Sequence, residues 1–382
     1  MMLPVSRRII HLAPGDFWLI LNLLGRDRVL DGPGIGVFER RFAGFIGTRN
    51  AVAAATGRLG LSLLLDAYNL PEGGEIILPA YEDLSVPKVI SDAGLKPVCV
   101  DIDTETNNID PREIARRLSD RTAAVIVAHL FGNPCDMDAI KRVLKSRNIV
   151  LLEDCAHAVG STIDGRHVGT FGDAAFFSFH TTKPFMTFGG CMVTTDNDEV
   201  AEHVRSRTSS LPFPNQQDLI KRIITAYLMH LLTHRFFFPW TLYPILRLCN
   251  RLGVNPVSAY NKTLRKSVKI AHTTARYTNL QAMIGLRHLN LVEEHRCRRL
   301  ANARILDEEL AGLVEKPAVS EGFNGYFWLL YTDGREKARH DLFRLGIDTG
   351  NDLMRDCSLE TGDAGECPQT AEVRKRSLQV PI

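Results

Sequence analysis

The sequence predicts an α/β protein with a large, mostly parallel sheet and a smaller C-terminal α+β domain. The chain has 382 residues, of which 45% are hydrophobic and 24% charged, enough for one large core and a smaller second one. Between residues 51 and 195, short apolar runs alternate with segments of helical periodicity, which is typical of a sheet covered by helices. Residues 311–382 mix short helical and extended patterns, which favours the smaller domain.

Six apolar runs in the first half of the chain are the predicted strands. They are EIILP (75–79), KPVCVDI (96–102), AAVIVAHL (123–130), IVLLED (149–154), AAFFSF (174–179) and CMVTT (191–195). Strands this apolar are expected to be buried on both faces. The predicted helices are PREIARRL (111–118), MDAIKRVLKSR (137–147) and one long helix over 279–310.

Residues 211–268 differ from the rest and form a predicted insertion between regions 1–210 and 269–382. The segment 219–234 carries a helical apolar stripe with Leu219, Ile223, Tyr227 and Leu231, opposed by Lys221 and Arg222. An aromatic segment, RFFFPWTLYPILRLC, follows it, and no charge-free run reaches the roughly 18 residues that a spanning helix needs. Aromatic and basic residues together suit the headgroup layer of a membrane. The alternative is packing on the protein itself, because apolar stripes usually face a core.

Composition excludes several classes of protein. Lysine and arginine number 46 against 44 acidic residues, so no global field would recruit nucleic acid. The eight cysteines form no C-x-x-C pair and lack zinc-ligand spacing, so we expect no metal and reduced thiols in a cytoplasmic protein. The N-terminal segment has no continuous apolar run that ends in a small-residue cleavage site, so we do not expect the protein to be exported.

Acidic residues end one predicted strand. Glu153 and Asp154 close IVLLED, and ligands of open α/β sheets bind beyond the carboxyl ends of strands. A carboxylate beside a pyridinium nitrogen keeps that nitrogen protonated and strengthens the ring as an electron sink. Taken alone, an acid in this place is more often a helix cap or a solvated charge.

A lysine follows another predicted strand. Lys183 comes shortly after AAFFSF, and a lysine in apolar surroundings loses its proton more readily, as a Schiff-base nucleophile requires. By itself such a lysine is nearly always a surface group. The lysine and the acidic strand end together are a far more specific signal.

The two segments resemble one enzyme family. EDCAHA (153–158), GDAAFFSFHTTK (172–183) and GGCMVTTD (189–196) are similar to the DegT/DnrJ/EryC1/StrS aminotransferases. These are enzymes of fold type I that use pyridoxal 5'-phosphate (PLP) to aminate keto-sugars, mostly nucleotide-linked ones. Residues 34–57, 77–103, 129–140 and 280–289 also match the family, so the resemblance covers nearly the whole chain apart from 211–268.

The resemblance implies a role for each candidate site residue. Lys183 would hold the cofactor as a Schiff base and carry protons, and Asp154 would pair with the pyridine nitrogen. His157 would lie near the ring face, with a satisfied loop histidine as the plainer interpretation. Ser178 and the backbone N–H groups after Thr56 and Gly57, at the start of a predicted helix, would bind the phosphate, although a capped helix needs Thr56 in either case. The family also implies a homodimer with the active site at its interface, which the helix 279–310 would support.

Several positions depart from the family pattern. Arg58 stands where a small hydroxyl residue is usual, and its guanidinium either ligates the phosphate or points outward. Glu82 and Asp83 replace a threonine and an aromatic residue, which puts ring stacking and part of the substrate pocket in question. Thr274 replaces an asparagine that reaches the neighbouring subunit's phosphate, while Arg276 matches. Family members continue into a further helix after the final Pro-Ile, so we expect a truncated small domain.

Transamination from an amino acid, with glutamate implied by the resemblance, is the leading functional hypothesis. A sugar dehydratase of the same fold is the nearest rival, but that variant generally lacks the lysine that is present here at position 183. The alternative of a different class is a non-catalytic PLP-fold protein that acts as a scaffold or regulator. A bound-cofactor absorbance band that shifts when glutamate is added would separate the two.

Overall fold

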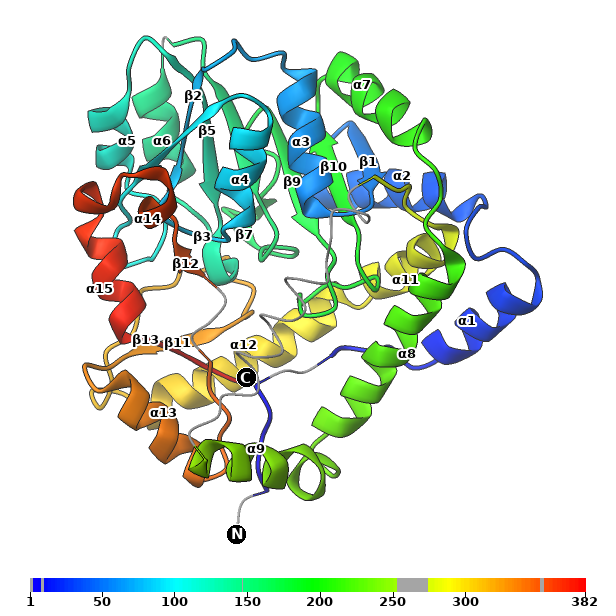
Figure 1. The fold of residues 1–382 in the computed structure, drawn as a ribbon, viewed down its shortest axis with the longest axis vertical. Helices are drawn as coiled ribbons and strands as arrows, with labels where there is room; N and C mark the ends of the chain where they lie inside the picture. Colours follow the sequence, from blue (N-terminus) through cyan, green and yellow to red (C-terminus); the bar gives the residue numbers. More distant parts are fainter. Residues whose placement is uncertain (1–2, 8–9, 146, 253–273, 351–353) are drawn as a thin grey trace.

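A seven-stranded sheet forms the centre of the molecule (Figure 1). The computed structural model describes residues 3–7, 10–145, 147–252, 274–350 and 354–382. The strand order is β1-β10-β9-β6-β5-β2-β4, and β10 runs antiparallel to its two neighbours while the other neighbouring pairs are parallel. These strands are β1 (Asn50–Ala54), β2 (Glu75–Pro79), β4 (Lys96–Val100), β5 (Thr122–Ala128), β6 (Val150–Asp154), β9 (Ala174–Ser178) and β10 (Cys191–Thr195). The predicted fold class is confirmed.

Helices cover both faces of this sheet. One face packs against α3 (Gly57–Ala67), α4 (Ser85–Asp92) and α7 (Asp198–Ser209). The other packs against α2 (Gly34–Ile46), α5 (Pro111–Arg117), α6 (Met137–Leu144) and α11 (Asn279–Leu289). Strand β2 shows the alternation, because Ile76 and Leu78 join the first core and Ile77 joins the second.

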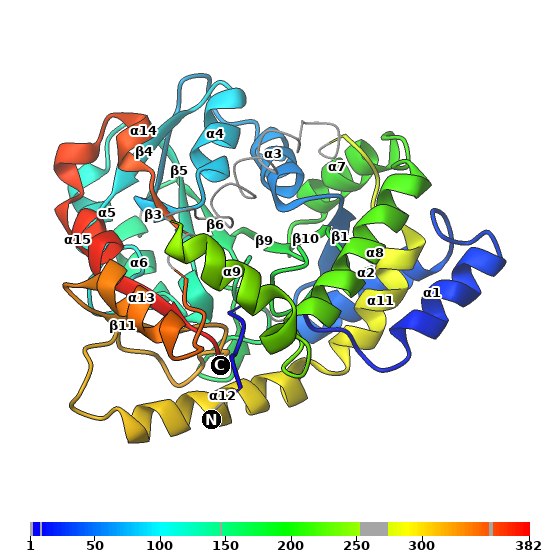
Figure 2. The ribbon, with the colours of Figure 1, turned by 60° about the horizontal axis from the view of Figure 1, so that its bottom comes forward.

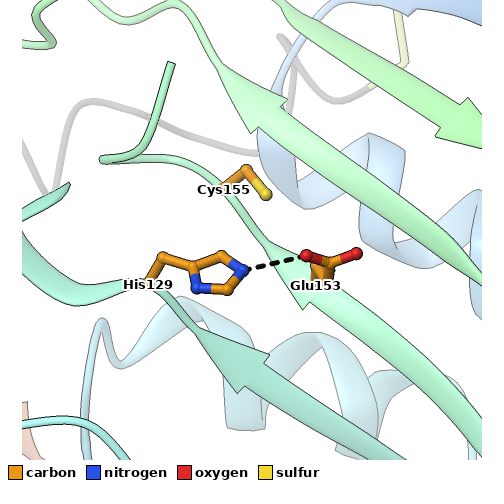
Figure 3. Close-up of side chains that lie close together, drawn as sticks. All are labelled: His129, Glu153 and Cys155. Atoms are coloured by element: carbon orange, nitrogen blue, oxygen red, sulfur yellow. Dashed lines mark hydrogen bonds and ion pairs between the residues drawn. The ribbon is translucent and has the colours of Figure 1, made fainter. Parts of the chain in front are cut away.

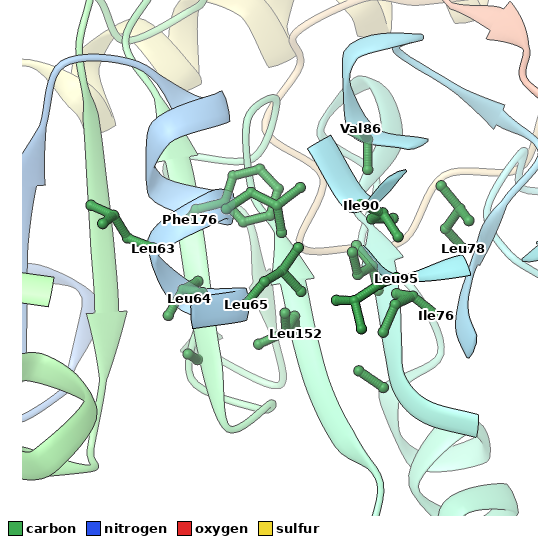
Figure 4. Close-up of a cluster of buried hydrophobic side chains, with 14 of the residues drawn as sticks. Leu63, Leu64, Leu65, Ile76, Leu78, Val86, Ile90, Leu95, Leu152 and Phe176 are labelled. Carbon is green, nitrogen blue, oxygen red and sulfur yellow. The ribbon is translucent and has the colours of Figure 1, made fainter. Parts of the chain in front are cut away.

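The core between α3, α4 and the sheet is made of aliphatic side chains (Figure 4). Leu64 and Leu65 of α3 lie in one buried cluster with Leu152 of β6 and Phe176 of β9. Burial of one such leucine contributes about 2 kcal/mol, so α3 is held firmly against the strands. The packing fixes the start of α3 at the carboxyl edge of the sheet.

The C-terminal region forms the smaller domain that the sequence predicts. Its antiparallel pair is β11 (Trp328–Tyr331) with β13 (Ser377–Val380), and its helices are α12 (Val292–Glu309), α13 (Arg335–Arg344), α14 (Ser358–Thr361) and α15 (Pro368–Arg376). The short strand β12 (Arg355–Asp356) pairs with β3 (Tyr81–Glu82), which ties this domain to the large one. The remaining short elements are β7 (Thr162–Ile163), β8 (Arg166–His167), η1 (Leu130–Gly132) and η4 (Ala364–Glu366).

The prediction of one long helix over 279–310 is wrong. The chain forms α11 and α12, which are separated at Asn290 and Leu291. The apolar residues of α11 pack on α2, where the ring of Phe38 lies directly over Gly285 and leaves no room for a side chain there. These residues therefore face the chain's own core, and the expected homodimer gains no support from them.

The region before and within the predicted insertion adds helices along one rim of the molecule. They are α1 (Asp16–Gly25), α8 (Gln216–Thr233), η2 (Phe238–Trp240) and α9 (Leu242–Arg251), and Figures 1 and 2 show α8 running between α1 and α9. Residues 253–268 of the insertion lie outside the described part of the chain. Within the described residues, none of the helices combines the length and the apolar character needed to cross a bilayer.

All eight cysteines lie in the described residues and are free thiols. Cys249 on α9 is half-buried and Cys297 on α12 is exposed, whereas the other six are buried. Burial raises the pKa of each buried thiol, that of Cys99 to about 12.

Candidate active site

Candidate residues gather at one edge of the sheet because strands that run in the same direction end together. The residues found there are Thr56 and Gly57 after β1, Glu82 after β2, His129 after β5, Asp154 at the end of β6, and Ser178 at the end of β9 with Lys183 shortly beyond it. The elements that carry them span more than a hundred residues of sequence.

Lys183 lies half-buried in the turn after β9, where its backbone N–H donates to the carbonyl of His180 at 2.9 Å. Burial lowers the pKa of its ammonium, and the nearby carboxylates of Asp154, Asp83 and Glu82 oppose that shift without cancelling it. The hydroxyl of Tyr326 donates to the carbonyl of Thr182 at 2.7 Å and holds the turn. The lysine is thus brought closer to the neutral form that acts as a nucleophile.

Asp154 is buried at the carboxyl end of β6. Its Oδ1 accepts a hydrogen bond from the backbone N–H of Ala156 at 2.8 Å. Burial raises the pKa of Asp154 to about 6, although that hydrogen bond and the charge of Lys183 act in the opposite direction. Its carboxyl group therefore remains mostly ionised at pH 7.

His157 lies on the turn after β6 between two aromatic rings. The centroid of its ring is 5.0 Å from that of Tyr326 and 5.9 Å from that of Phe131. The backbone N–H of Phe131 donates to His157 Nδ1 at 3.2 Å, and burial lowers the pKa of the imidazole well below its usual value. The ring is therefore neutral and carries its proton on Nε2.

The start of α3 offers backbone donors next to Ser178. Thr56 Oγ1 accepts from the N–H of Leu59 at 3.1 Å, which caps the helix as the plainer interpretation requires. The N–H groups of Gly57 and Arg58 have no hydrogen-bond acceptor among the residues that the structure describes. A Cβ placed on Gly57 would lie 3.5 Å from Cβ of Ser178, so the serine sits directly against this helix start. This set of donors is suited to a phosphate group.

The departures from the family pattern lie in different places. Arg58 is half-buried and makes no hydrogen bond or ion pair within the described chain, which leaves both of its proposed orientations open. Thr274 is exposed, and the guanidinium of Arg276 lies 4.4 Å from the ring centroid of Phe213. Neither residue is hydrogen-bonded to the candidate site within the described residues.

Glu82, by contrast, lies within the site. Its Oε1 accepts from the N–H of Asp83 at 2.7 Å, while its Oε2 is buried without a hydrogen-bond partner in the described residues. Burial, and after it the charge of Asp154, raises the pKa of Glu82 well above its usual value. The sequence marks this position only as a departure from the family pattern and gives no sign of a buried acid with a raised pKa.

Glu153, His129 and Cys155 form a second buried cluster just inside the sheet edge (Figure 3). His129 Nδ1 accepts from the N–H of Cys135 at 3.0 Å, so its Nε2 carries the proton and donates to Glu153 Oε2 at 3.0 Å. Glu153 also accepts from the backbone N–H groups of Gly169, Phe171 and Gly172. Burial alone would raise the pKa of Glu153, but the hydrogen bonds outweigh it and hold the pKa below its usual value. The ligand atoms are engaged within the protein, and we assign no metal to them.

Tyr326 is a further site residue that sequence reasoning missed. It contacts the ring of His157 and the turn that carries Lys183, although it lies in the small domain. No motif marks this tyrosine. Its place depends on how the two domains pack, which a local pattern does not encode.

Comparison with known proteins gives a family match and close relatives. The model of the DegT/DnrJ/EryC1/StrS aminotransferase family matches residues 18–230. GDP-perosamine synthase from Caulobacter vibrioides is 31% identical over 323 residues, which cover 82% of this chain and 74% of the synthase. A dTDP-3-amino-3,6-dideoxy-alpha-D-galactopyranose transaminase from Aneurinibacillus thermoaerophilus is 38% identical over 44% of this chain and 46% of its own length. Matches to other curated relatives likewise span about half of their length, 48% and 45% in two cases.

Solved structures show the same architecture over the full chain. The crystal structure of DesI in the presence of its TDP-sugar product superposes with a TM-score of 0.75 at 26% identity. The superposition covers 100% of this chain and 88% of DesI.

Proposed function

Because the chain belongs to the DegT/DnrJ/EryC1/StrS aminotransferase family, we propose that it uses PLP to transfer an amino group from an amino acid, with glutamate as the donor, to a nucleotide-linked keto-sugar. The observation that carries this proposal is the meeting of Lys183 and Asp154 at one sheet edge, beside the free N–H groups of α3. The names of two relatives, a GDP-sugar synthase and a dTDP-sugar transaminase, support the substrate class.

The described residues fit the cofactor. When bound, PLP supplies an aldehyde that condenses with amines and a ring that accepts an electron pair. Lys183 Nζ is the amine that would attach to it, and Asp154 Oδ2 would face the ring nitrogen. Ser178 and the N–H groups of Gly57 and Arg58 would hold the phosphate.

The protein's own groups then have distinct tasks. The lowered pKa of Lys183 makes its Nζ easier to deprotonate, and a deprotonated Nζ would accept a proton from one carbon and return it to another. Asp154 is mostly ionised at pH 7, and its carboxylate would hold a proton on the ring nitrogen of bound PLP. Neutral His157 packs between Tyr326 and Phe131 and would orient the face of the PLP ring. Burial raises the pKa of Glu82 well above its usual value, and in its protonated form Glu82 would donate a hydrogen bond from Oε2 to a sugar hydroxyl.

Cofactor binding gives the first test. The purified chain is incubated with PLP and dialysed, and its absorbance is recorded before and after addition of glutamate. We expect a visible band that survives dialysis and shifts with glutamate. Lys183→Ala should lose the dialysis-resistant band, whereas the exposed-lysine control Lys337→Ala should keep it.

A panel of nucleotide-linked keto-sugars then tests amination, with the product amine identified by mass spectrometry. A wild-type chain that binds no cofactor and aminates no member of the panel would favour the scaffold or regulator alternative. A band that shifts with glutamate, without amination of any sugar, would retain the transaminase chemistry and reject the sugar class.

We further propose that the enzyme is a cytoplasmic homodimer with peripheral membrane contact through its insertion. The dimer rests on family resemblance, since the apolar face of α11 is buried within the chain. Light scattering should give twice the mass of one chain, and a fully active monomer would contradict it.

A further inference from the structure

An apolar surface extends over α1, α8 and α9 without a partner in the described chain. Two tryptophans stand out, because Trp240 is 80% exposed and Trp18 is 71% exposed. Other large apolar side chains surround them, namely Phe17 and Leu21 on α1, Ile224, Leu228 and Leu231 on α8, Phe236 and Phe237 before η2, and Ile245, Leu248 and Leu252 on and after α9. We call these residues the α1–α8–α9 surface. Soluble proteins rarely expose so many large apolar side chains together unless the surface binds something.

Helix α8 is apolar on two opposite sides. Leu219, Ile223 and Ala226 are buried in one cluster with residues of α1 and α11, as expected for a helix that packs on its own protein. Ile224, Leu228 and Leu231 lie at helical spacing on the other side and are exposed. The sequence predicts that Leu219, Ile223 and Leu231 share one stripe that faces either lipid or the protein itself. The structure divides this stripe, because Leu219 and Ile223 pack within the protein and Leu231 is exposed. Packing within the chain accounts for one apolar side of α8, and the described residues provide no partner for the other side.

The three helices form one continuous rim of the molecule (Figures 1 and 2). The ring of Phe17 on α1 lies 6.2 Å from that of Tyr227 on α8, measured between centroids. Thr241 Oγ1, just before α9, donates to the carbonyl of Leu232 on α8 at 3.4 Å. The exposed residues are therefore parts of one surface.

Buried aromatic residues attach the η2 and α9 part of this surface to the small domain. Phe238 and Tyr243, which belong to the aromatic segment that the sequence predicts to suit a headgroup layer, pack against Phe343 of the small domain. The hydroxyl of Tyr243 donates to the carbonyl of Phe343 at 2.8 Å. Because these two aromatic residues anchor η2 and α9, the neighbouring Phe236, Phe237 and Trp240 are held at the surface.

Basic residues predominate on the α8 and α9 part of this surface, while Asp27, just after α1, is an exposed acid. From residue 219 to residue 252 the sequence contains no aspartate or glutamate, and its basic residues are Lys221, Arg222, Arg235, Arg247 and Arg251. Arg235, Arg247 and Arg251 are exposed. Asp218, in the first turn of α8, is the sole acid of that helix.

We propose that the α1–α8–α9 surface docks on an anionic lipid bilayer, with its apolar side chains in the headgroup layer and its arginines facing lipid phosphates. Tryptophan and arginine both find partners in that layer. A second copy of the chain is a poorer occupant, because a two-fold contact would place the exposed Arg235, Arg247 and Arg251 of both copies in one interface.

One hydrogen bond connects the proposed docking surface with the segment that follows Lys183. Arg222 of α8 donates from Nη1 to the carbonyl of Phe188 at 3.0 Å, on the segment that follows Lys183. The docked helix is thereby joined to the turn that carries the lysine. The proposal itself does not depend on amination, and a failure of either can be recognised separately.

Vesicle co-sedimentation of the full chain loaded with PLP tests the proposal. Vesicles of phosphatidylcholine alone are compared with vesicles of equal parts phosphatidylcholine and phosphatidylglycerol. We expect the wild type to pellet with the anionic vesicles and to pellet much less with the neutral ones. The double variant Trp18→Ser with Trp240→Ser should bind about tenfold more weakly, because two anchoring rings are lost.

A matched control replaces exposed leucines elsewhere. Leu313→Ser with Leu359→Ser removes two side chains that are 76% and 59% exposed, and it should pellet like wild type. Circular dichroism establishes that each variant is folded, and light scattering reports self-association.

Wild type that stays in the supernatant with anionic vesicles overturns the proposal. If such a chain self-associates and the tryptophan variant does not, the surface is a contact between copies. A tryptophan variant that pellets as well as wild type overturns it too.

Discussion

Glu153 and Asp154 are neighbours at the end of β6, yet they belong to two different regions of the molecule. Glu153 lies just inside the sheet edge, where His129 and three backbone N–H groups saturate its oxygens and the pKa is held low. Asp154 lies at the edge itself, with one backbone hydrogen bond and a pKa raised to about 6. The two side chains point to opposite faces of one strand.

The difference separates structural from functional polar groups. A saturated buried carboxylate stabilises the fold and has no lone pair left for a ligand. A buried carboxylate with few partners destabilises the chain without ligand, and a positively charged ligand that binds beside it offsets that destabilisation. The same contrast distinguishes the unpartnered Oε2 of Glu82 from the fully engaged oxygens of Glu153.

The largest expected effect concerns Lys183, which belongs to the functional region. Lys183→Ala should lower turnover by about a thousandfold or more, because the attachment point and the proton carrier are lost together. Amination of a keto-sugar measures it, and thermal unfolding should show a folded variant. Turnover close to wild type would remove Lys183 from the site.

Asp154→Asn should lower turnover by about a hundredfold while the chain still binds PLP, because a neutral amide does not hold the pyridinium proton. The measurement is the rate at saturating cofactor, alongside the bound-cofactor absorbance. An unchanged rate would mean that Asp154 is only a cap for the turn at Ala156.

Glu153→Gln should mainly lower the stability of the fold, whereas the Lys183 and Asp154 variants mainly lower turnover. It replaces a saturated carboxylate by an amide whose NH₂ group would face backbone donors, at a cost of about 2 kcal/mol in the free energy of unfolding. Urea denaturation measures it, with exposed Glu308→Gln as the control. Unchanged stability would show that the network around Glu153 does not hold the sheet edge.

The pH dependence of folding stability tests the difference between Asp154 and Glu153 through the raised pKa of Asp154. The folded pKa of Asp154, about 6, lies above its ordinary 3.8, so the folded chain binds the proton more tightly than the unfolded chain does. For the chain prepared without cofactor, this group therefore costs stability as the pH rises from about 4 to 6. Relative to wild type, Asp154→Asn should gain on the order of 3 kcal/mol of stability over that window and none below it. A pH-independent difference would contradict the raised pKa.

Local pattern was enough to find most of the sheet. Strands β2 and β10 have the predicted bounds, because apolar β-branched runs between turn residues are a strong local signal. Strand β1, rich in alanine, carries no such signal and was not predicted as a strand. The break between α11 and α12 was missed because neither glycine nor proline marks Asn290 and Leu291.

The residues of the candidate site also fall into two groups, those that the sequence predicts and those that it does not. Family motifs gave Lys183, Asp154, His157 and Ser178, which the parallel strands then bring to one edge. Tyr326 and the buried Oε2 of Glu82 could not be predicted, because both depend on contacts between distant segments. The apolar stripe on α8 was visible in the sequence, but which of its two sides is exposed depends on the packing of α1 and α11.

The burial of six thiols has a practical consequence for spectroscopy. A maleimide fluorophore would react first with exposed Cys297 on α12 and slowly with half-buried Cys249, since the buried thiols are both inaccessible and raised in pKa. In a Cys249→Ser background, Cys297 becomes a single native labelling position. A dye placed there would report by quenching how far α12 stands from a lipid surface, without any engineered cysteine.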